Sequence, residues 1–236
     1  MKRGGKRARS PAVQPKMGTM SGRNGSRELP LQVEPGPTPG VKRVLDVVGA
    51  GLVLAVLWPI WLLTLALIKL DSPGPAIVRQ KRVGLDNREF TFYKFRTMVD
   101  SPHNDLAGRI PKGDLTKRLL SPRGRPPNAT TIGWVLRKTT MDELPQLLNV
   151  VKGDMSLVGP RPDIPEIVAH WPPHFRQRHK VKPGMTGLAQ VNGRSDLTHY
   201  QKVRYDLEYV RHHPISRDVW VLLKTFTLVL SKKGAR

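Results

Sequence analysis

Two adjacent acids, Asp142 and Glu143, lie in the run TTMDELP at residues 139–145. In one interpretation they belong to a helix cap, because Thr140 and Glu143 have the spacing of a capping box and the helix dipole favours an acid at Asp142. Pro145 weakens this interpretation, since with Thr140 as N-cap it would fall at the fifth helical position and remove a backbone hydrogen bond. A helix that starts at Asp142 or Glu143 instead keeps Pro145 in its first turn, where proline is tolerated.

The second interpretation places both carboxylates at a helix N-terminus, where ionised acids are stabilised and phosphate oxygens are attracted. An ionised Asp beside a bound phosphate can act as a nucleophile, with its neighbour as base or metal ligand. We therefore treat Asp142 and Glu143 as candidate catalytic and metal-binding residues for phosphate chemistry.

Basic and glycine-rich segments lie close to the acid pair in the sequence. Arg137 precedes it, and Arg161 stands between two prolines in GDMSLVGPRP (153–162), which stiffens its backbone. Arginine suits bidentate contacts with phosphate. The run KPGMTGLAQVNGR (182–194) combines glycines with amide, hydroxyl and guanidinium donors, a composition suited to a phosphate or nucleotide loop. Each segment alone also fits a turn or a solvated charge, but together they indicate a phosphorylated substrate.

The composition limits the other kinds of chemistry. The chain of 236 residues has 40 Lys and Arg against 18 acids, a formal charge of +22. This excess favours nucleic acid, an anionic membrane face or a phosphate-rich substrate as partner. The absence of Cys excludes disulfides, thiolate zinc sites and Cys nucleophiles. The seven His residues lack the spacing of a metal site, and we interpret them as structural or surface residues.

One segment is long and apolar enough to enter a membrane. Residues 47–68 are uncharged throughout, and as a helix they would extend roughly 33 Å, comparable with a hydrocarbon core of about 30 Å. Pro59 predicts a kink, and basic residues flank both ends, whereas the positive-inside rule places them on one side. We therefore favour a re-entrant helix that bends at Pro59 over a single span. Asp46 is then expected at the headgroup level, with Lys42 or Arg43 as its partner.

The remaining segments predict a mainly helical α+β fold. Residues 1–40 lack apolar periodicity and are predicted to be disordered. We expect a small β-hairpin from residues 76–78 and 90–95, a loop over 100–128, and helices over 133–151, 198–210 and 218–230. The last helix is either an amphipathic helix in the membrane interface or an ordinary core-facing helix. The predicted domains are a basic tail (1–40), a membrane helix (41–70) and a catalytic domain (71–236).

From about Val41 to Arg236 the chain resembles the bacterial sugar transferase family, the monotopic phosphoglycosyl transferases that act on polyprenyl phosphate. Five ordered motifs carry the resemblance: KRxxD (42–46), YKFRTM (93–98), DELPQL (142–147), GDMSLVGPRP (153–162) and GxTGxAQVNGR (184–194). The family breaks its membrane helix at a proline, which Pro59 matches, although Trp58 stands where many members have Ser. The tail at 1–40 and the WPP stretch at 171–173 lie outside the family pattern.

This resemblance implies transfer of a phospho-sugar from a nucleotide diphosphate sugar, usually a UDP-sugar, to undecaprenyl phosphate with release of UMP. It implies the initiating step of exopolysaccharide, capsule, O-antigen or glycoprotein glycan assembly, at the cytoplasmic face of the bacterial inner membrane. It also implies Mg²⁺ at Asp142 and Glu143, and a covalent phospho-sugar intermediate on Asp142. The candidate substrate-binding residues are Lys94, Arg96, Arg137, Arg161, Gln190, Asn192 and Arg194.

Two other function classes stay open on the sequence. A basic nucleic-acid-binding protein explains the charge but leaves residues 47–68 without a role, and a catalytically idle membrane scaffold requires an unused acid pair. The sequence names neither the transferred sugar nor the oligomeric state, a homo-oligomer included.

Overall fold

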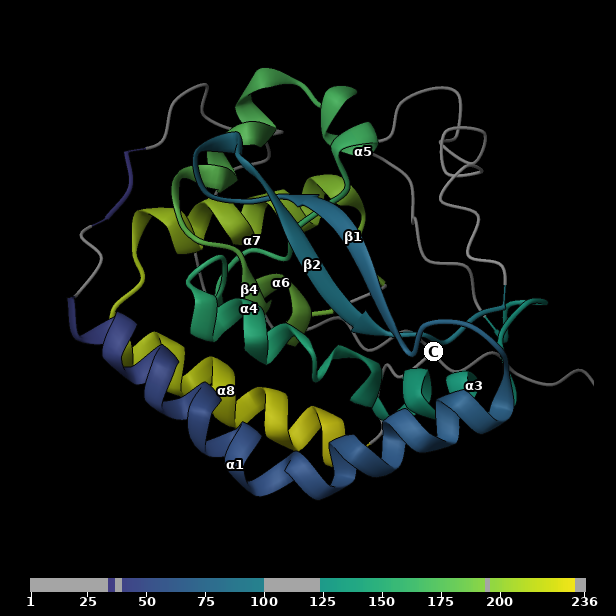
Figure 1. Cartoon of the computed structure of the whole chain (residues 1–236). Helices are drawn as coiled ribbons and strands as arrows, with labels where there is room; N and C mark the ends of the chain where they lie inside the picture. The colour runs from purple at the N-terminus through teal and green to yellow at the C-terminus, as the bar shows by residue number, and fades with distance from the viewer. Residues whose placement is uncertain (1–33, 37–39, 100–123, 194–195, 232–236) are drawn as a thin grey trace, which may run out of the picture.

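The computed structural model describes residues 34–36, 40–99, 124–193 and 196–231 (Figure 1). The predicted disordered tail and the predicted loop over 100–128 therefore lie almost entirely outside the described residues. In chain order the elements are α1 (Gly40–Asp71), β1 (Ile77–Val83), η1 (Leu85–Asn87), β2 (Glu89–Phe95), α3 (Thr131–Thr139), η4 (Met141–Glu143), α4 (Gln146–Lys152), β3 (Ser156–Val158), α5 (Pro165–Ala169), η5 (Pro173–Lys180), β4 (Gly184–Thr186), α6 (Leu188–Val191), α7 (His199–Arg211) and α8 (Ile215–Leu230).

The uncharged segment forms most of the 32-residue helix α1, which continues through Pro59. Its most apolar 18-residue window has a mean hydropathy of 2.4 and is only 11% buried. Within the described residues, α1 is the one helix whose length and composition would allow it to cross a membrane. Figure 1 shows α1 bent near its middle, so that both ends rise toward the rest of the molecule. A bend is the expected consequence of a proline inside a helix.

The N-terminal end of α1 is fastened to the domain by the KRxxD motif. Arg43 donates to the carbonyl oxygens of Val150 and Val151 at 2.6 and 2.8 Å, at the C-terminal end of α4. Asp46 accepts bonds from the Ser156 hydroxyl and the Leu157 amide at 3.1 and 3.0 Å. Asp46 is 5% exposed and packs against β3, and its position at the headgroup level stays a prediction.

Lys42 takes part in the same junction. Its ammonium lies 3.9 Å from Asp46 but only 2.5 Å from Asp218 of α8, and it also donates to the carbonyl of Val158 at 3.3 Å. Tyr209 of α7 donates to the same carbonyl and to Asp218. One buried polar cluster therefore joins α1, β3, α7 and α8.

The C-terminal end of α1 is fastened to the same domain. Asp71 accepts a bond from the backbone amide of Ile132 at the start of α3. Arg96 donates to the carbonyl oxygens of Ile68 and Ser72 and to the Ser72 hydroxyl. Ile68 also packs in a small apolar cluster with Phe95 of β2. Both ends of α1 thus belong to one folded unit.

Two small sheets support the site. Strands β1 and β2 pair antiparallel, with Gln80 opposite Phe92, and Phe92 and Phe95 fill the core beneath them. The second sheet, the parallel pair β3 and β4, was missed by sequence reasoning because each strand has only three residues. Its strands approach so closely that a Cβ atom at Gly159 or Gly184 would overlap the other segment's backbone.

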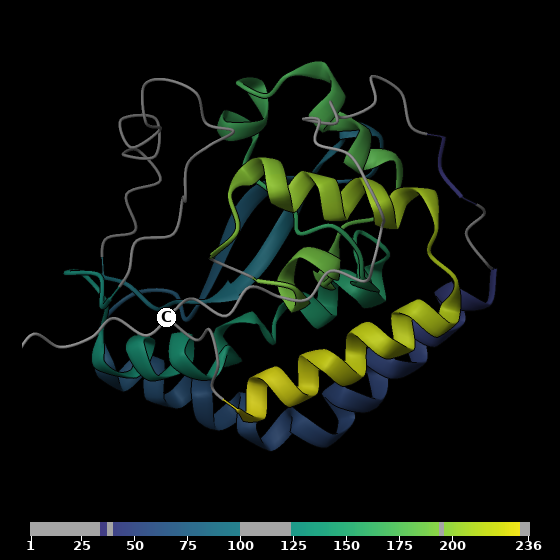
Figure 2. The same ribbon diagram turned by 180° about the vertical axis from the view of Figure 1, so that it is seen from behind.

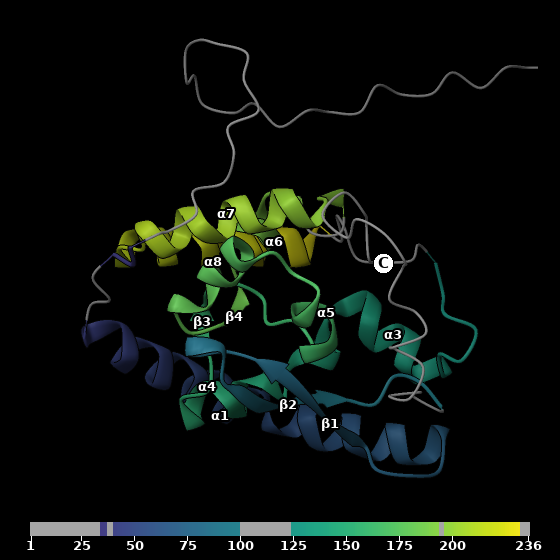
Figure 3. The same cartoon turned by 90° about the horizontal axis from the view of Figure 1, so that it is seen from above.

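The helices cover these sheets on two sides. Seen from above, α1 and α7 lie on opposite sides of the molecule (Figure 3), and the largest apolar cluster joins α7 to Val158, Trp171, Phe175 and Val221. The predicted helix over 198–210 is confirmed as α7, which starts with a capping box of Thr198 and Gln201. Figures 1 and 2 show α8 and α1 along the same lower side of the molecule.

We predict that Asp46→Ala lowers the free energy of unfolding by about 1–3 kcal/mol, because it leaves the Leu157 amide without its acceptor and leaves the Ser156 hydroxyl only the Val158 carbonyl. Thermal unfolding of the detergent-solubilised protein measures the loss. Asp46→Asn keeps an acceptor oxygen and should lose less; equal losses in the two variants would contradict the role given to this carboxylate.

Candidate functional site

The acid pair lies on the short 3-10 turn η4, between α3 and α4. Thr140, with φ 61° and ψ 10°, reverses the chain after α3, and its side chain makes no capping hydrogen bond. The capping-box interpretation is therefore wrong. The predicted helix start at Asp142 or Glu143 is also wrong, because α4 begins at Gln146 with Pro145 as its N-cap. Proline is tolerated at the N-cap because this position needs no helical N–H bond. Both acids therefore lie before α4 and not in its first turn.

Asp142 is almost fully buried and faces Lys94 of β2. The residue is 3% exposed, and its Oδ2 lies 2.6 Å from the Lys94 ammonium. Burial raises the pKa of Asp142 above its ordinary value, although the positive charge of Lys94 opposes the rise. The neighbouring Glu143 raises this pKa further, whereas Arg137 lowers it. Asp142 is therefore a carboxylate whose ionised form depends on nearby cations.

Glu143 faces the second cation, Arg161. The two nitrogens at the end of the guanidinium donate to the two carboxylate oxygens at 3.0 and 2.5 Å, a bidentate pair. Glu143 is the main reason that the pKa of Arg161 lies above its ordinary value. The side chains of Lys94 and Arg161 are 28% and 42% exposed, against 5% and 18% for the two acids. The cations therefore form the outer wall of the site, where an anionic substrate would meet them first.

The other predicted substrate-binding residues are placed differently. Arg137 lies close enough to lower the pKa of Asp142, and its buried Nε has no hydrogen-bond partner in the described part of the chain. Arg96 instead holds the end of α1, as described above, and is 8% exposed. Both amide atoms of Gln190 on α6 are buried without a partner among the described residues. Arg194 lies outside the described residues.

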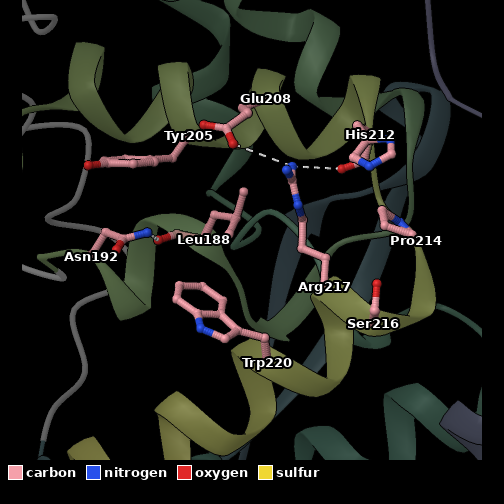
Figure 4. A pocket seen from close by; sticks show the side chains of 9 residues that line it. All are labelled: Leu188, Asn192, Tyr205, Glu208, His212, Pro214, Ser216, Arg217 and Trp220. Atoms are coloured by element: carbon pink, nitrogen blue, oxygen red, sulfur yellow. Dashed lines mark hydrogen bonds and ion pairs between the residues drawn. The ribbon is translucent and has the colours of Figure 1, made fainter. Parts of the chain in front are cut away.

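Asn192 lines a cavity between α6, α7 and α8 rather than the acid pair. Its side chain donates to Leu188 and accepts from Lys224 at 2.9 Å each. Figure 4 shows Asn192 beside Tyr205 and Trp220 in this cavity of about 480 Å³, with Arg217 between Glu208 and the carbonyl of His212. Neither Asp142 nor Glu143 lines it. The structure thus joins Asp142, Glu143, Lys94 and Arg161, with Arg137 nearby, and places Asn192 at a second location.

Several residues around the acid pair were missed by sequence reasoning. Gln146, one turn after the acids, is completely buried and has no partner for its amide atoms among the described residues. Arg82 and Arg178 bind the backbone around Arg161. Gln146 lies inside a quoted motif and could have been singled out, whereas nothing in the local sequence distinguishes Arg178 from other basic residues. No group of three or more His, Asp or Glu within the described residues is arranged to hold a metal.

Comparison with known proteins matches residues 38–232 to the family described as bacterial sugar transferase. The UDP-N-acetylgalactosamine-undecaprenyl-phosphate N-acetylgalactosaminephosphotransferase of Aeromonas hydrophila is 37% identical over 203 residues, 83% of this chain and 45% of that protein. The UDP-glucose:undecaprenyl-phosphate glucose-1-phosphate transferase of Xanthomonas campestris pv. campestris is 38% identical over 203 residues, 82% of this chain and 40% of that protein. The chain spans less than half the length of these two relatives.

A relative of more similar length comes from Caulobacter vibrioides. This UDP-glucose:undecaprenyl-phosphate glucose-1-phosphate transferase is 38% identical over 213 residues, which are 85% of this chain and 75% of that protein.

We predict that Lys94→Met raises the pKa of Asp142 further, because it removes the cation that opposes the effect of burial. A ¹³C NMR titration of the Asp142 carboxyl group measures the shift. Lys81→Met, on the exposed side of the same hairpin, is the matched control and should leave the titration unchanged. An unchanged Asp142 titration in Lys94→Met would show that this ion pair does not set the protonation of the acid.

Proposed function

The chain belongs to the bacterial sugar transferase family, and from this premise we propose that it transfers a phospho-sugar from a UDP-sugar to undecaprenyl phosphate and releases UMP. The observation that carries the proposal is the pairing of each acid with a more exposed cation, Asp142 with Lys94 and Glu143 with Arg161. Such a site offers a buried carboxylate nucleophile behind a wall that attracts a diphosphate. The names of the relatives, which act on UDP-sugars and undecaprenyl phosphate, agree with this chemistry.

In the first step, a carboxylate oxygen of Asp142 attacks the phosphorus that carries the sugar. A bond forms between this oxygen and phosphorus, the phosphorus–oxygen bond to UMP breaks, and UMP leaves with its electron pair. The carboxylate must be ionised to attack, and the Lys94 ammonium at 2.6 Å favours this form against the effect of burial. Lys94 then stands beside the charge that develops on the transferred phosphoryl group.

In the second step, an oxygen of the lipid phosphate attacks the same phosphorus and releases Asp142 as a carboxylate. Glu143 is placed to remove a proton from this second substrate or to position a metal ion. In this structure the Arg161 guanidinium binds both oxygens of the Glu143 carboxylate. A diphosphate that competes for the Arg161 guanidinium would free Glu143, so substrate binding and the availability of Glu143 are coupled in this proposal.

The residues present fit a magnesium ion. Mg²⁺ prefers oxygen ligands and is commonly held by one or two carboxylates together with water and substrate phosphates, which Asp142 and Glu143 could supply. When bound, it would neutralise charge on the diphosphate. Because both carboxylates are already paired with cations, we propose that metal and substrate enter together.

The attachment of both ends of α1 to one domain supports a re-entrant anchor. A helix that crosses a bilayer places its ends on opposite sides, yet Lys42 and Arg43 at one end and Asp71 at the other contact the same folded unit. Large apolar side chains remain exposed along α1 and on one face of α8, among them Leu52, Val56, Leu63, Leu222, Leu223 and Phe226. We propose that these two helices face the cytoplasmic leaflet of the bacterial inner membrane, with the acid pair on the cytoplasmic side.

The two rival functions are not favoured. A nucleic-acid-binding protein would leave α1 without a role, and the family match covers residues 38–232. An idle scaffold would have no use for two acids that are each paired with a cation beneath the surface.

For catalysis, we predict that Asp142→Asn lowers UMP release from a UDP-sugar by about 10³-fold or more, because an amide cannot act as the nucleophile. A panel of UDP-sugars with undecaprenyl phosphate and Mg²⁺ first identifies the sugar that the wild-type protein uses. Glu89→Gln, an exposed acid on the Lys94 strand, is the matched control and should keep wild-type activity. Near-normal UMP release by Asp142→Asn would refute the proposed nucleophile.

The chain contains no Cys, so a single introduced thiol can be labelled selectively to test the topology of α1. Val41→Cys and Leu70→Cys place thiols near the two ends of α1, at residues that are 58% and 85% exposed. A re-entrant helix predicts that a membrane-impermeant maleimide labels both in inverted vesicles and neither in intact spheroplasts. Labelling of the two positions from opposite sides would instead establish a single span.

A further inference from the structure

The backbone that carries Arg161 is held at successive carbonyl groups. We define the Arg161 loop as residues 159–163. Within it, Pro160 accepts from the Gly184 amide at 2.9 Å, and Arg161 accepts from the Arg178 guanidinium at 2.6 Å. The next two carbonyl oxygens, of Pro162 and Asp163, accept from the Arg82 guanidinium and the Val83 amide. Four carbonyls in a row are therefore bound by groups from other parts of the chain, which fixes the backbone of this loop.

Arg178 makes the shortest of these bonds and is a buried donor. Its side chain is 4% exposed. One terminal nitrogen donates to Asp163 at 2.9 Å, and the other lies 2.7 Å from Asp206 of α7 while it donates to the Arg161 carbonyl. Only a guanidinium presents donors in a fixed planar fork that can meet three such acceptors together. The bond to the Arg161 carbonyl is charge-assisted and correspondingly strong.

Trp171, the first residue of the WPP stretch, covers this guanidinium. The Trp171 ring lies 5.2 Å from the centre of the Arg178 guanidinium and stacks at 5.8 Å on the ring of His179. It also meets Phe175 edge-on at 6.1 Å. These contacts fix η5, which carries Arg178, against the core.

We propose that Arg178 is a positioning residue, which fixes the Arg161 loop so that the Arg161 guanidinium meets Glu143 in bidentate geometry. Among the described residues, its contacts reach the Arg161 carbonyl, Asp163, Asp206 and Trp171 but neither acid of the pair. Its effect on the reaction therefore passes through Arg161. The inference deepens the proposed function and rests on it, since the importance of the Arg161–Glu143 pair follows from that reaction.

The alternative is that Arg178 only stabilises the fold, and the experiment must distinguish this from a positioning role. Burial alone would raise the pKa of Asp163, but Arg178 contributes to holding it below its ordinary value. Burial raises the pKa of Asp206 to about 6 even though Arg178 opposes the rise. An apolar residue in place of Arg178 would remove the nearest positive charge from these two buried acids and would destabilise the fold. Arg178→Lys keeps a positive charge between them but loses the planar fork, so it tests positioning more cleanly.

The experiment is a double-mutant cycle in the full chain, with UMP release as the readout. Arg178→Lys should lower the rate by about tenfold, because small displacements of a positioned group are costly to catalysis. In an Arg161→Lys background, the same substitution should cost less than about twofold, since the guanidinium that it positions is already gone. Equal costs in the two backgrounds would assign Arg178 a structural role and overturn the proposal. Arg176→Lys, exposed on the same segment, is the control and should have no effect in either background.

A second readout needs no activity. In the wild-type protein, the Arg161 side chain should give a separate ¹⁵N–¹H NMR signal at Nε, assigned by its loss in Arg161→Lys. Arg178→Lys should broaden this signal or move it to the position of a solvated arginine, while the thermal unfolding transition remains cooperative. An unchanged signal would overturn the inference even if the protein releases no UMP. Absence of UMP release from the wild-type protein, with the signal altered as expected, would instead refute only the proposed function.

Discussion

Two neighbouring carboxylates beneath the surface constrain the rest of this structure, because each of them needs a cation. Burial and mutual repulsion both raise the pKa of Asp142, so without nearby positive charge the acid would tend to be neutral. The fold brings Lys94 and Arg161 to the pair from two separate supports, the β1–β2 hairpin and the loop that follows β3. Each acid of the site is thus already paired with a cation by the fold itself.

Helix α1 is part of the same organisation, because its contacts reach the segments that carry the site. Asp46 and Lys42 both bind β3, three to five residues before Arg161, and Arg43 binds the end of α4, the helix that follows the acid pair. At the other end, Arg96, which directly follows the Lys94 strand, holds Ile68 and Ser72. The two cations that face the acids therefore come from the two segments on which α1 is anchored.

The sequence predicted the parts of the fold that have strong local signals. The long uncharged run, the proline within it, the helix at 198–210 and the antiparallel aromatic strand all follow from composition and periodicity. The short parallel pair β3–β4 could not be predicted, because three residues carry no periodic pattern and its pairing partner lies far along the chain. Of the predicted substrate-binding residues, Lys94 and Arg161 contact the acid pair, whereas Arg96 and Asn192 lie elsewhere. Arg96 lies one residue beyond the β2 strand that carries Lys94, yet its side chain binds the end of α1. The direction of this side chain is set by tertiary contacts, which the local sequence does not reveal.

The central claim is that Asp142, held ionised behind Lys94, carries the sugar phosphate between the two substrates. The most direct measurement is mass spectrometry of the purified protein after incubation with the UDP-sugar it uses and Mg²⁺, without lipid phosphate, followed by peptide mapping under conditions that preserve acyl phosphates. The account predicts a mass increase of one sugar phosphate on the peptide that contains residues 139–147, located on Asp142, which disappears when undecaprenyl phosphate is added. An unmodified protein that still forms lipid product, or an adduct on any other residue, would contradict it.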